Sequence, residues 1–296
     1  MAPNPATRGG AATKSLLHMA IVLALALGIA LAGSHTGARW AGWPVFALCA
    51  LLALIIQWLA FVPAWLLQTE KFYDLTGSCT YLAVVWLAVG LSGAEDTRSL
   101  LLAGCISLWA LRLGSFLFLR ILKDGNDSRF DQIKPHAGKF LFTWTLQGLW
   151  VLITAGCALA AISSTGAGPA GGLEALGLLL WVAGFAIEIA ADHQKRVFRR
   201  RQGGEGFISS GLWARSRHPN YFGEILLWCG IAMLAAPALA GWQWLTLISP
   251  LFVYLLLTRV SGVPLLERKA ARRWGHDPEW QAYQANTPVL VPRLWR

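Results

Sequence analysis

The chain has 296 residues, of which 56% are hydrophobic and only 14% are charged, and its mean hydropathy is +0.51. Soluble domains carry about 25% charged residues, so this composition excludes an ordinary soluble protein and indicates a membrane protein. The net charge of +10 would suit nucleic-acid binding only if the basic residues formed a patch of their own. They follow the membrane topology instead, so we expect no nucleic-acid partner.

Eight segments are apolar and long enough to cross about 30 Å of hydrocarbon, which takes roughly 20 helical residues. In chain order they are residues 15–32, 43–67, 75–91, 99–122, 140–162, 173–191, 221–240 and 242–260. The last two are separated only by the region around Pro237 and also fit a shorter helical hairpin. We therefore predict an all-α polytopic membrane bundle of seven or eight spans. Residues 14–296 would form one domain, after a disordered tail at residues 1–13 that is rich in Ala, Gly and Pro.

Basic residues are concentrated in alternate loops. If the N-terminus is cytoplasmic, most of the 25 Lys and Arg residues fall in cytoplasmic segments, as the positive-inside rule requires. We predict that both termini are cytoplasmic and that the first span is retained rather than cleaved as a signal peptide.

Polar residues within or beside the spans are informative, because a charge at mid-bilayer costs roughly 2.5–3.5 kcal/mol on insertion scales. They are Gln57, Gln68, Glu70, Tyr73, Asp74, Arg112, Arg120, Gln147, Glu188, Glu224, Arg259 and Glu267. Nearly all fall in the cytoplasmic half, which predicts a polar pocket that is lined by several helices and opens to the cytoplasm. For any single residue, a structural salt bridge between helices is the alternative.

A basic segment follows the sixth span. Asp192, Lys195, Arg196 and Arg199 recur at i, i+3, i+4 and i+7, so they share one helical face. Three bases suit phosphates and a carboxylate suits ribose hydroxyls, which favours a nucleotide. Anionic lipid headgroups are the alternative, and we favour them for neighbouring Arg200 and Arg201.

Other cofactor sites have no support in the sequence. The strand, Gly-rich turn and helix of a soluble dinucleotide domain are missing, so a cofactor would have to be held within the helical bundle. The five cysteines and six histidines show no spacing typical of a metal site, and we expect no metal.

Seven short motifs carry a family resemblance. They are "DLTG" at 74–77, "NDSRF" at 126–130, "LQGLW" at 146–150, "DHQKRVFR" at 192–199, "GLWARSRHPNYFGE" at 211–224, "SGVPLLE" at 261–267 and "YQANTPVLVP" at 283–292. With them the sequence resembles the steroid 5-alpha-reductase-like membrane family, DUF1295. Its superfamily includes sterol C14 and C24 reductases and isoprenylcysteine carboxyl methyltransferases, and "RHPNY" alone is common to reductases and methyltransferases.

The resemblance implies a bundle of about seven helices in a bacterial inner membrane. NADPH would lie in its cytoplasmic half, with a lipid-facing substrate cavity above. The expected cofactor-binding residues are Asp192, Lys195, Arg196, Arg199, His218, Asn220, Tyr221, Glu224, Arg259 and Glu267. The expected pocket residues are Trp109, Arg112 and Gln147, and Trp109 stands where the resemblance leads us to expect a Tyr.

The chemistry that the resemblance implies is reduction of a C=C bond in a steroid-like, isoprenoid or other lipid substrate. It needs a hydride source, here NADPH, and an acid or hydrogen-bond donor, for which Gln68, Glu70 and Tyr73 are the candidates. We expect a dry cavity to raise the pKa of Glu70 so that it stays protonated.

Two other functions remain open. One is an S-adenosylmethionine-dependent lipid or isoprenylcysteine-type methyltransferase, and the other is a non-enzymatic sterol- or lipid-binding membrane protein. The bases at Lys195, Arg196 and Arg199 favour the dinucleotide, because S-adenosylmethionine has no phosphate. Membrane lipids are expected neighbours, and no obligate protein partner is evident.

Overall fold

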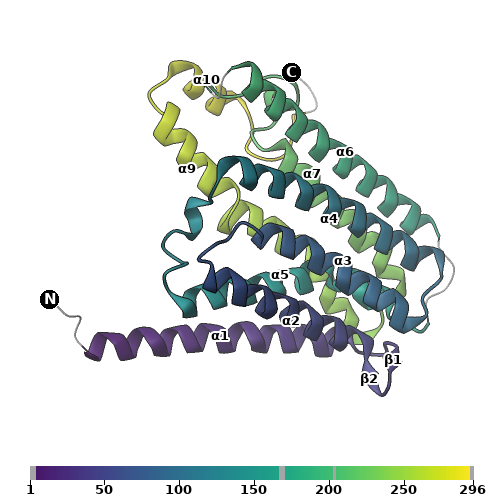
Figure 1. The fold of residues 1–296 in the computed structure, drawn as a ribbon. Helices are drawn as coiled ribbons and strands as arrows, with labels where there is room; N and C mark the ends of the chain where they lie inside the picture. Colours follow the sequence, from purple (N-terminus) through teal and green to yellow (C-terminus); the bar gives the residue numbers. More distant parts are fainter. Residues whose placement is uncertain (1–4, 167–170, 203–204, 294–296) are drawn as a thin grey trace. The chain divides into compact units, whose positions relative to one another are not determined.

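The fold is built from membrane-spanning helices. The computed structural model describes residues 5–166, 171–202 and 205–293, and over these ranges its regular structure is helical apart from one two-stranded hairpin (Figure 1). Eight helical stretches are long and apolar enough to cross a bilayer, which confirms the predicted polytopic bundle. The contacts group the chain into two compact units, where the sequence predicted one domain. The units are residues 1–170 with 235–249, and residues 171–234 with 250–296.

The first unit contains five long helices. They are α1 (Pro5–Gly33), α2 (Val45–Leu66), α3 (Tyr73–Ser92), α4 (Thr97–Asp124) and α5 (Ala137–Ile162). The shorter elements are β1 (Arg39–Trp40), β2 (Trp43–Pro44) and the 3-10 turns η1 (Ser128–Phe130), η3 (Ala236–Ala238) and η4 (Gly241–Ile248). Helix α5 contacts the other four long helices and is the most buried of the spans, so it forms the centre of this unit.

The second unit holds the remaining elements. They are α6 (Gly172–Arg201), η2 (Gly211–Ala214), α7 (Pro219–Ala235), α8 (Ser249–Leu255), the π-helical turn η5 (Leu256–Val260), α9 (Val263–Trp274) and α10 (Pro278–Asn286). Helix α6 continues without a break through the basic segment, as predicted. Helix α7 begins at Pro219, where a proline loses no hydrogen bond because the first helical N–H groups have no partner within the helix.

Helices α6 and α7 pack with their backbones in contact. A Cβ atom built on Gly184 would lie 2.5 Å from the carbonyl oxygen of Gly223, and one built on Gly230 would lie 2.5 Å from that of Gly177. The two glycines on each helix are seven residues apart, about two helical turns. Glycine allows this approach, which is a common way for helices to associate within membranes.

The last apolar stretch is not one regular helix. It runs through η4, α8 and η5 before the chain bends at Gly262 and continues as α9. A Cβ atom on Gly262 would lie 2.6 Å from the carbonyl oxygen of Leu257 and 2.8 Å from the ring of Tyr221. The bend therefore needs a residue without a side chain, and it separates α9 from the span that precedes it.

The N-terminal tail differs from the prediction. Helix α1 begins at Pro5, so residues 5–13, which the sequence predicted to be disordered, are helical in the structure. A proline in the first turn and a run rich in alanine both favour a helix. Residues 1–4 lie outside the described residues.

Candidate functional site

A cavity of about 250 Å³ lies in the second unit, between α6 and α9, and we call it the α6–α9 pocket. Its walls come from α6, the segment 206–218, α9 and α10. The lining residues are Lys195, Phe198, Arg199, Gly206, Phe207, Ile208, Trp213, Arg217, His218, Leu266, Glu267, Lys269, Ala270, Arg273, Trp274, Trp280 and Tyr283. Four expected cofactor residues, Lys195, Arg199, His218 and Glu267, are thereby brought together.

Two helical faces define the opposite walls. Lys195, Phe198 and Arg199 are at i, i+3 and i+4 on α6, so they lie on one side of that helix. On α9 the lining residues follow the same period: Leu266, Lys269 and Ala270, then Arg273 and Trp274. Each wall therefore presents apolar and cationic side chains together.

Aromatic rings form much of the apolar lining. Phe207 stacks on Tyr283 with ring centroids 5.5 Å apart, and it meets Trp280 edge-on at 5.0 Å. The Trp274 and Trp280 centroids are 5.6 Å apart. Two cations lie over rings: Lys195 Nζ is 4.6 Å from the centre of Trp213, and the Arg273 guanidinium is 5.1 Å from Trp274. A flat aromatic ligand with negative charge would be complementary to such a surface.

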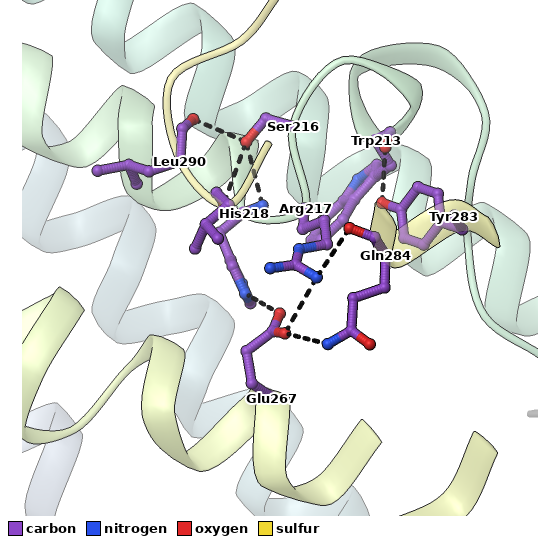
Figure 2. A network of polar contacts seen from close by, with 9 residues as sticks. Trp213, Ser216, Arg217, His218, Glu267, Tyr283, Gln284 and Leu290 are labelled. Atoms are coloured by element: carbon purple, nitrogen blue, oxygen red, sulfur yellow. Dashed lines mark hydrogen bonds and ion pairs between the residues drawn. The ribbon is translucent and has the colours of Figure 1, made fainter. Parts of the chain in front are cut away.

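Glu267 organises one end of the pocket (Figure 2). Its carboxylate lies 2.8 Å from His218 Nε2 and 3.4 Å from Arg217 Nη1, and it accepts a hydrogen bond from Gln284 Nε2 at 3.4 Å. Because an ionised carboxylate can only accept, Nε2 of His218 must carry a proton.

The charge of His218 follows from its surroundings. The side chain is buried, and this burial lowers its pKa below the ordinary 6.5. The positive charges of Lys195 and Arg217 lower the pKa further, although the hydrogen bond and charge of Glu267 oppose them. His218 is therefore neutral at pH 7, and Arg217 provides the cationic partner of Glu267.

The C-terminal segment holds this end of the pocket in place. Ser216 Oγ donates to the carbonyl oxygen of Leu290 at 2.7 Å, and Arg217 N–H donates to that of Pro288 at 2.9 Å. Tyr283 Oη donates to the carbonyl oxygen of Trp213 at 2.6 Å (Figure 2). Backbone and side-chain bonds thus fix the segment before α7 against the end of the chain.

The other six expected cofactor residues do not line the pocket. They are Asp192, Arg196, Asn220, Tyr221, Glu224 and Arg259. Three of them lie in the first two turns of α7, directly after His218. The Tyr221 ring stacks on that of His218, with centroids 5.6 Å apart. Within the described residues, Asn220 Oδ1 is a buried acceptor without a hydrogen-bond partner, and the Arg259 side chain is exposed.

In the first unit, Glu70 is an ion-paired carboxylate. It is 4% exposed, lies 2.5 Å from Lys134 Nζ and accepts a hydrogen bond from the backbone N–H of Asp127 at 2.8 Å. Burial alone would raise its pKa, but the hydrogen bonds from Lys134 and Asp127 outweigh burial, and the pKa lies below 4.5. The expectation of a raised pKa and a protonated Glu70 was wrong, because a cation 64 residues further along the chain neutralises the site.

The two neighbouring candidates differ from Glu70. Gln68 is exposed beyond the end of α2, has a φ of 49°, and donates to the carbonyl oxygen of Trp65 at 2.8 Å. Tyr73 is buried among Phe130, Phe140 and Trp144, and its hydroxyl donates to the carbonyl oxygen of Thr143 at 3.0 Å.

The three expected pocket residues are all in the first unit, and Gln147 among them has a buried polar side chain. It is 7% exposed, packs against Gly77, and its Oε1 has no hydrogen-bond partner within the described part of the chain. Trp109 is buried and meets Tyr81 edge-on at 5.1 Å, while the Arg112 guanidinium is 5.7 Å from the centre of Phe116.

Sequence reasoning missed most of the pocket's aromatic and cationic lining. Lys269 and Arg273 are four residues apart, as are Ala270 and Trp274, and this helical spacing was a readable signal. Trp280 and Tyr283 are three residues apart on α10, whereas Phe207 lies on a different segment and shares no period with them. Three tryptophans, Trp213, Trp274 and Trp280, also line the pocket.

The fold and this pocket define a polytopic helical membrane protein with a cavity lined by aromatic and basic side chains. The DUF1295 family model, described as a protein of unknown function, matches residues 60–287. The chain belongs to the DUF1295 family.

Curated proteins give partial matches. The chain is 31% identical over 118 residues to 3-oxo-5-alpha-steroid 4-dehydrogenase 1 of Rattus norvegicus, covering 39% of this chain and 40% of that protein. It is 34% identical over 120 residues to the Mus musculus protein of the same name, covering 40% and 41%, and 28% identical over 121 residues to steroid 5-alpha-reductase DET2 of Gossypium hirsutum, covering 40% and 42%. The chain therefore matches about two-fifths of the length of these relatives. No solved structure matched it significantly.

Proposed function

We infer that this protein is a membrane reductase that transfers a hydride from NADPH to a C=C bond of a steroid-like, isoprenoid or other lipid substrate. The observation that carries the proposal is the α6–α9 pocket, where four residues expected to contact the cofactor line one cavity with aromatic walls. The names of the relatives, steroid 5-alpha-reductase and 3-oxo-5-alpha-steroid 4-dehydrogenase, support the class of reaction.

The donor set of the pocket fits a phosphorylated nucleotide. Lys195, Arg199 and Arg217 offer cationic donors for phosphate oxygens, and the rings of Phe207 and Trp280 offer faces and edges for a base. In the proposal Asn220, Tyr221 and Glu224 hold the part of the cofactor that continues towards α7. When bound, NADPH supplies the hydride.

We propose that the substrate contacts residues of α3 and α5 in the first unit. Gln147 would accept a hydrogen bond there, since its Oε1 is a buried acceptor that no described residue satisfies. Of Gln68, Glu70 and Tyr73, we favour Tyr73 as the proton donor, because Glu70 is ion-paired and Gln68 is exposed. In the proposal the Tyr73 hydroxyl gives up its hydrogen bond to the Thr143 carbonyl oxygen and donates to a substrate oxygen instead.

Ligand-induced stabilisation tests the proposal. Detergent-purified protein is titrated with NADPH and, separately, with S-adenosylmethionine while the unfolding temperature is followed. The reductase proposal predicts a rise with NADPH alone. A rise with S-adenosylmethionine alone would instead identify a methyltransferase, and no rise with either would favour a lipid-binding protein without this cofactor.

A further inference from the structure

We propose that a groove between α3 and α4 binds one phospholipid whose zwitterionic headgroup carries a primary amine, as in phosphatidylethanolamine. The groove has a volume of about 410 Å³, within the roughly 300–1,000 Å³ that is usual for small-molecule sites. All its residues belong to the first unit and none lines the α6–α9 pocket, so the inference is independent of the proposed function. The lining residues are Leu75, Ser78, Cys79, Leu82, Ala110, Leu111, Gly114, Ser115, Phe118 and Leu119.

Small residues form the floor of the groove. The two helices touch at Gly114, where an added Cβ atom would lie 2.5 Å from the side chain of Ser78. Cys79 on α3 and Ala110 and Ser115 on α4 are also small, so a gap remains beside this contact. The other lining residues are leucines and one phenylalanine.

The lining suits hydrocarbon. Ser78 Oγ donates to the carbonyl oxygen of Asp74 at 3.2 Å, and Ser115 Oγ donates to that of Leu111 at 2.6 Å. Both hydroxyl donors in the lining are therefore used within their own helices. The part of a ligand that lies in the groove is apolar.

The length of the groove matches one leaflet of a bilayer. Ala110 is at the middle of α4, which runs from Thr97 to Asp124. Leu119 lies nine residues further on, about 14 Å along the helix axis. This is close to half of the roughly 30 Å hydrocarbon core. An acyl chain in the leaflet at the C-terminal end of α4 spans the same depth.

Charged side chains of both signs lie at that end of the groove. Asp74 and Arg120 each adjoin a lining leucine in the sequence, and Arg120 Nη2 is 4.0 Å from Asp74 Oδ2. Their side chains are 30% exposed for Asp74 and 42% for Arg120, so both are open to a ligand. Lys123 and Asp124 follow at the end of α4 and are exposed. Two cations and two carboxylates thus border the groove where a headgroup would lie.

This balance of charge favours a zwitterion. An anionic headgroup would be attracted by the cations but repelled by the carboxylates, whereas a zwitterion satisfies both. In the inferred complex the phosphate accepts from the Arg120 guanidinium, and the lipid ammonium donates to the Asp74 carboxylate. A choline headgroup has no N–H to donate, so the primary amine is the distinguishing feature.

Lipid affinity of the full-length chain is measured by native mass spectrometry in detergent, after removal of co-purified lipid. Phosphatidylethanolamine, phosphatidylcholine and phosphatidylglycerol with identical acyl chains are titrated separately. We expect one phosphatidylethanolamine to bind with roughly tenfold or more higher affinity than phosphatidylcholine, the effect of one charge-assisted hydrogen bond.

Two variants test the place of binding. Cys79→Phe/Ser115→Phe fills the groove from two exposed positions and should weaken phosphatidylethanolamine binding by roughly tenfold or more. Gly90→Phe/Gly104→Phe is the matched control. It adds the same rings to the same two helices at positions outside the groove where a Cβ atom meets nothing within 4 Å, and it should bind like the wild type.

Two further variants test the headgroup. Asp74→Asn should reduce the affinity for phosphatidylethanolamine to that for phosphatidylcholine, with phosphatidylcholine binding unchanged as evidence that the variant is folded. Asp131→Asn removes an exposed carboxylate that does not line the groove and should keep the preference.

The inference is refuted by equal affinity of the wild type for phosphatidylethanolamine and phosphatidylcholine, by a preference for phosphatidylglycerol, or by unchanged binding in the filled variant. A dimeric mass that only the filled variant loses would assign the groove to contact between two copies of the chain, and would also refute it. These outcomes leave the proposed function in place, because none of them depends on NADPH.

Discussion

At the residue scale, Glu70 shows how a buried carboxylate can hold two segments together. It joins the turn after α2 to the 127–134 loop through the Asp127 N–H and Lys134. The pKa of Glu70 is lowered in the folded protein, so its contribution to stability is fully present above about pH 4.5. That contribution is lost as the pH falls through the lower folded value.

Glu70→Gln should therefore lower the free energy of unfolding at pH 7 by roughly 2 kcal/mol, because it leaves a half-buried ammonium without its carboxylate. The difference from the wild type should shrink as the pH falls below 4.5. Thermal unfolding in detergent across this range measures both effects. Asp131→Asn is the matched control, since its exposed carboxylate lies 3.8 Å from the same ammonium and contributes little. A pH-independent difference would contradict the ionised state of Glu70.

Tyr73 tests the proposed proton donor. Tyr73→Phe removes only the hydroxyl that contacts the Thr143 carbonyl, and we expect enone-dependent NADPH oxidation to fall by roughly 100-fold or more. Stabilisation by NADPH should stay as in the wild type. Tyr254→Phe, at a partly exposed position, should leave both readouts unchanged. Full turnover by Tyr73→Phe would remove Tyr73 from the chemistry.

At the element scale, the approach of α6 to α7 depends on four glycines. Gly184→Ala or Gly223→Ala would place a methyl group 2.5 or 2.6 Å from the backbone of the opposite helix. We expect either change to cost about 1–3 kcal/mol. Gly90→Ala in α3 meets nothing within 4 Å, so it should be neutral or stabilising by up to about 1 kcal/mol. Unfolding temperatures of the three variants measure the contrast, and equal temperatures would contradict backbone contact between α6 and α7.

Helical periodicity was enough to predict some elements and some of the site. The i, i+3, i+4, i+7 spacing at residues 192–199 placed Lys195 and Arg199 on one face of a continuous helix, and both line the pocket. Periodicity did not reveal that Lys134 neutralises Glu70, because the pairing depends on tertiary contact across 64 residues. Nor did it reveal Phe207 beside Trp280, since each belongs to a short segment with a different neighbour in the chain.

At the scale of the whole molecule, we expect the eight candidate spans to leave both termini on the same side of the membrane. The distribution of Lys and Arg predicts that this side is the cytoplasm. An alkaline phosphatase fusion after Gly93 should be active and one after Lys134 inactive, while a green fluorescent protein at the C-terminus should fluoresce. The reverse pattern in the phosphatase pair would overturn the orientation.

The walls of the α6–α9 pocket are separated along the chain. Lys195 and Arg199 come from α6, whereas Glu267 and Tyr283 come from the last helices, and Pro288 and Leu290 hold the segment before α7. During synthesis, α6 and α7 are therefore inserted before Glu267, Gln284 and Pro288, the described partners of Arg217, have been made. The pocket is complete only when residues beyond 283 have left the ribosome, and a protease that cuts after α8 would release a membrane-inserted chain that lacks the α9 and α10 walls.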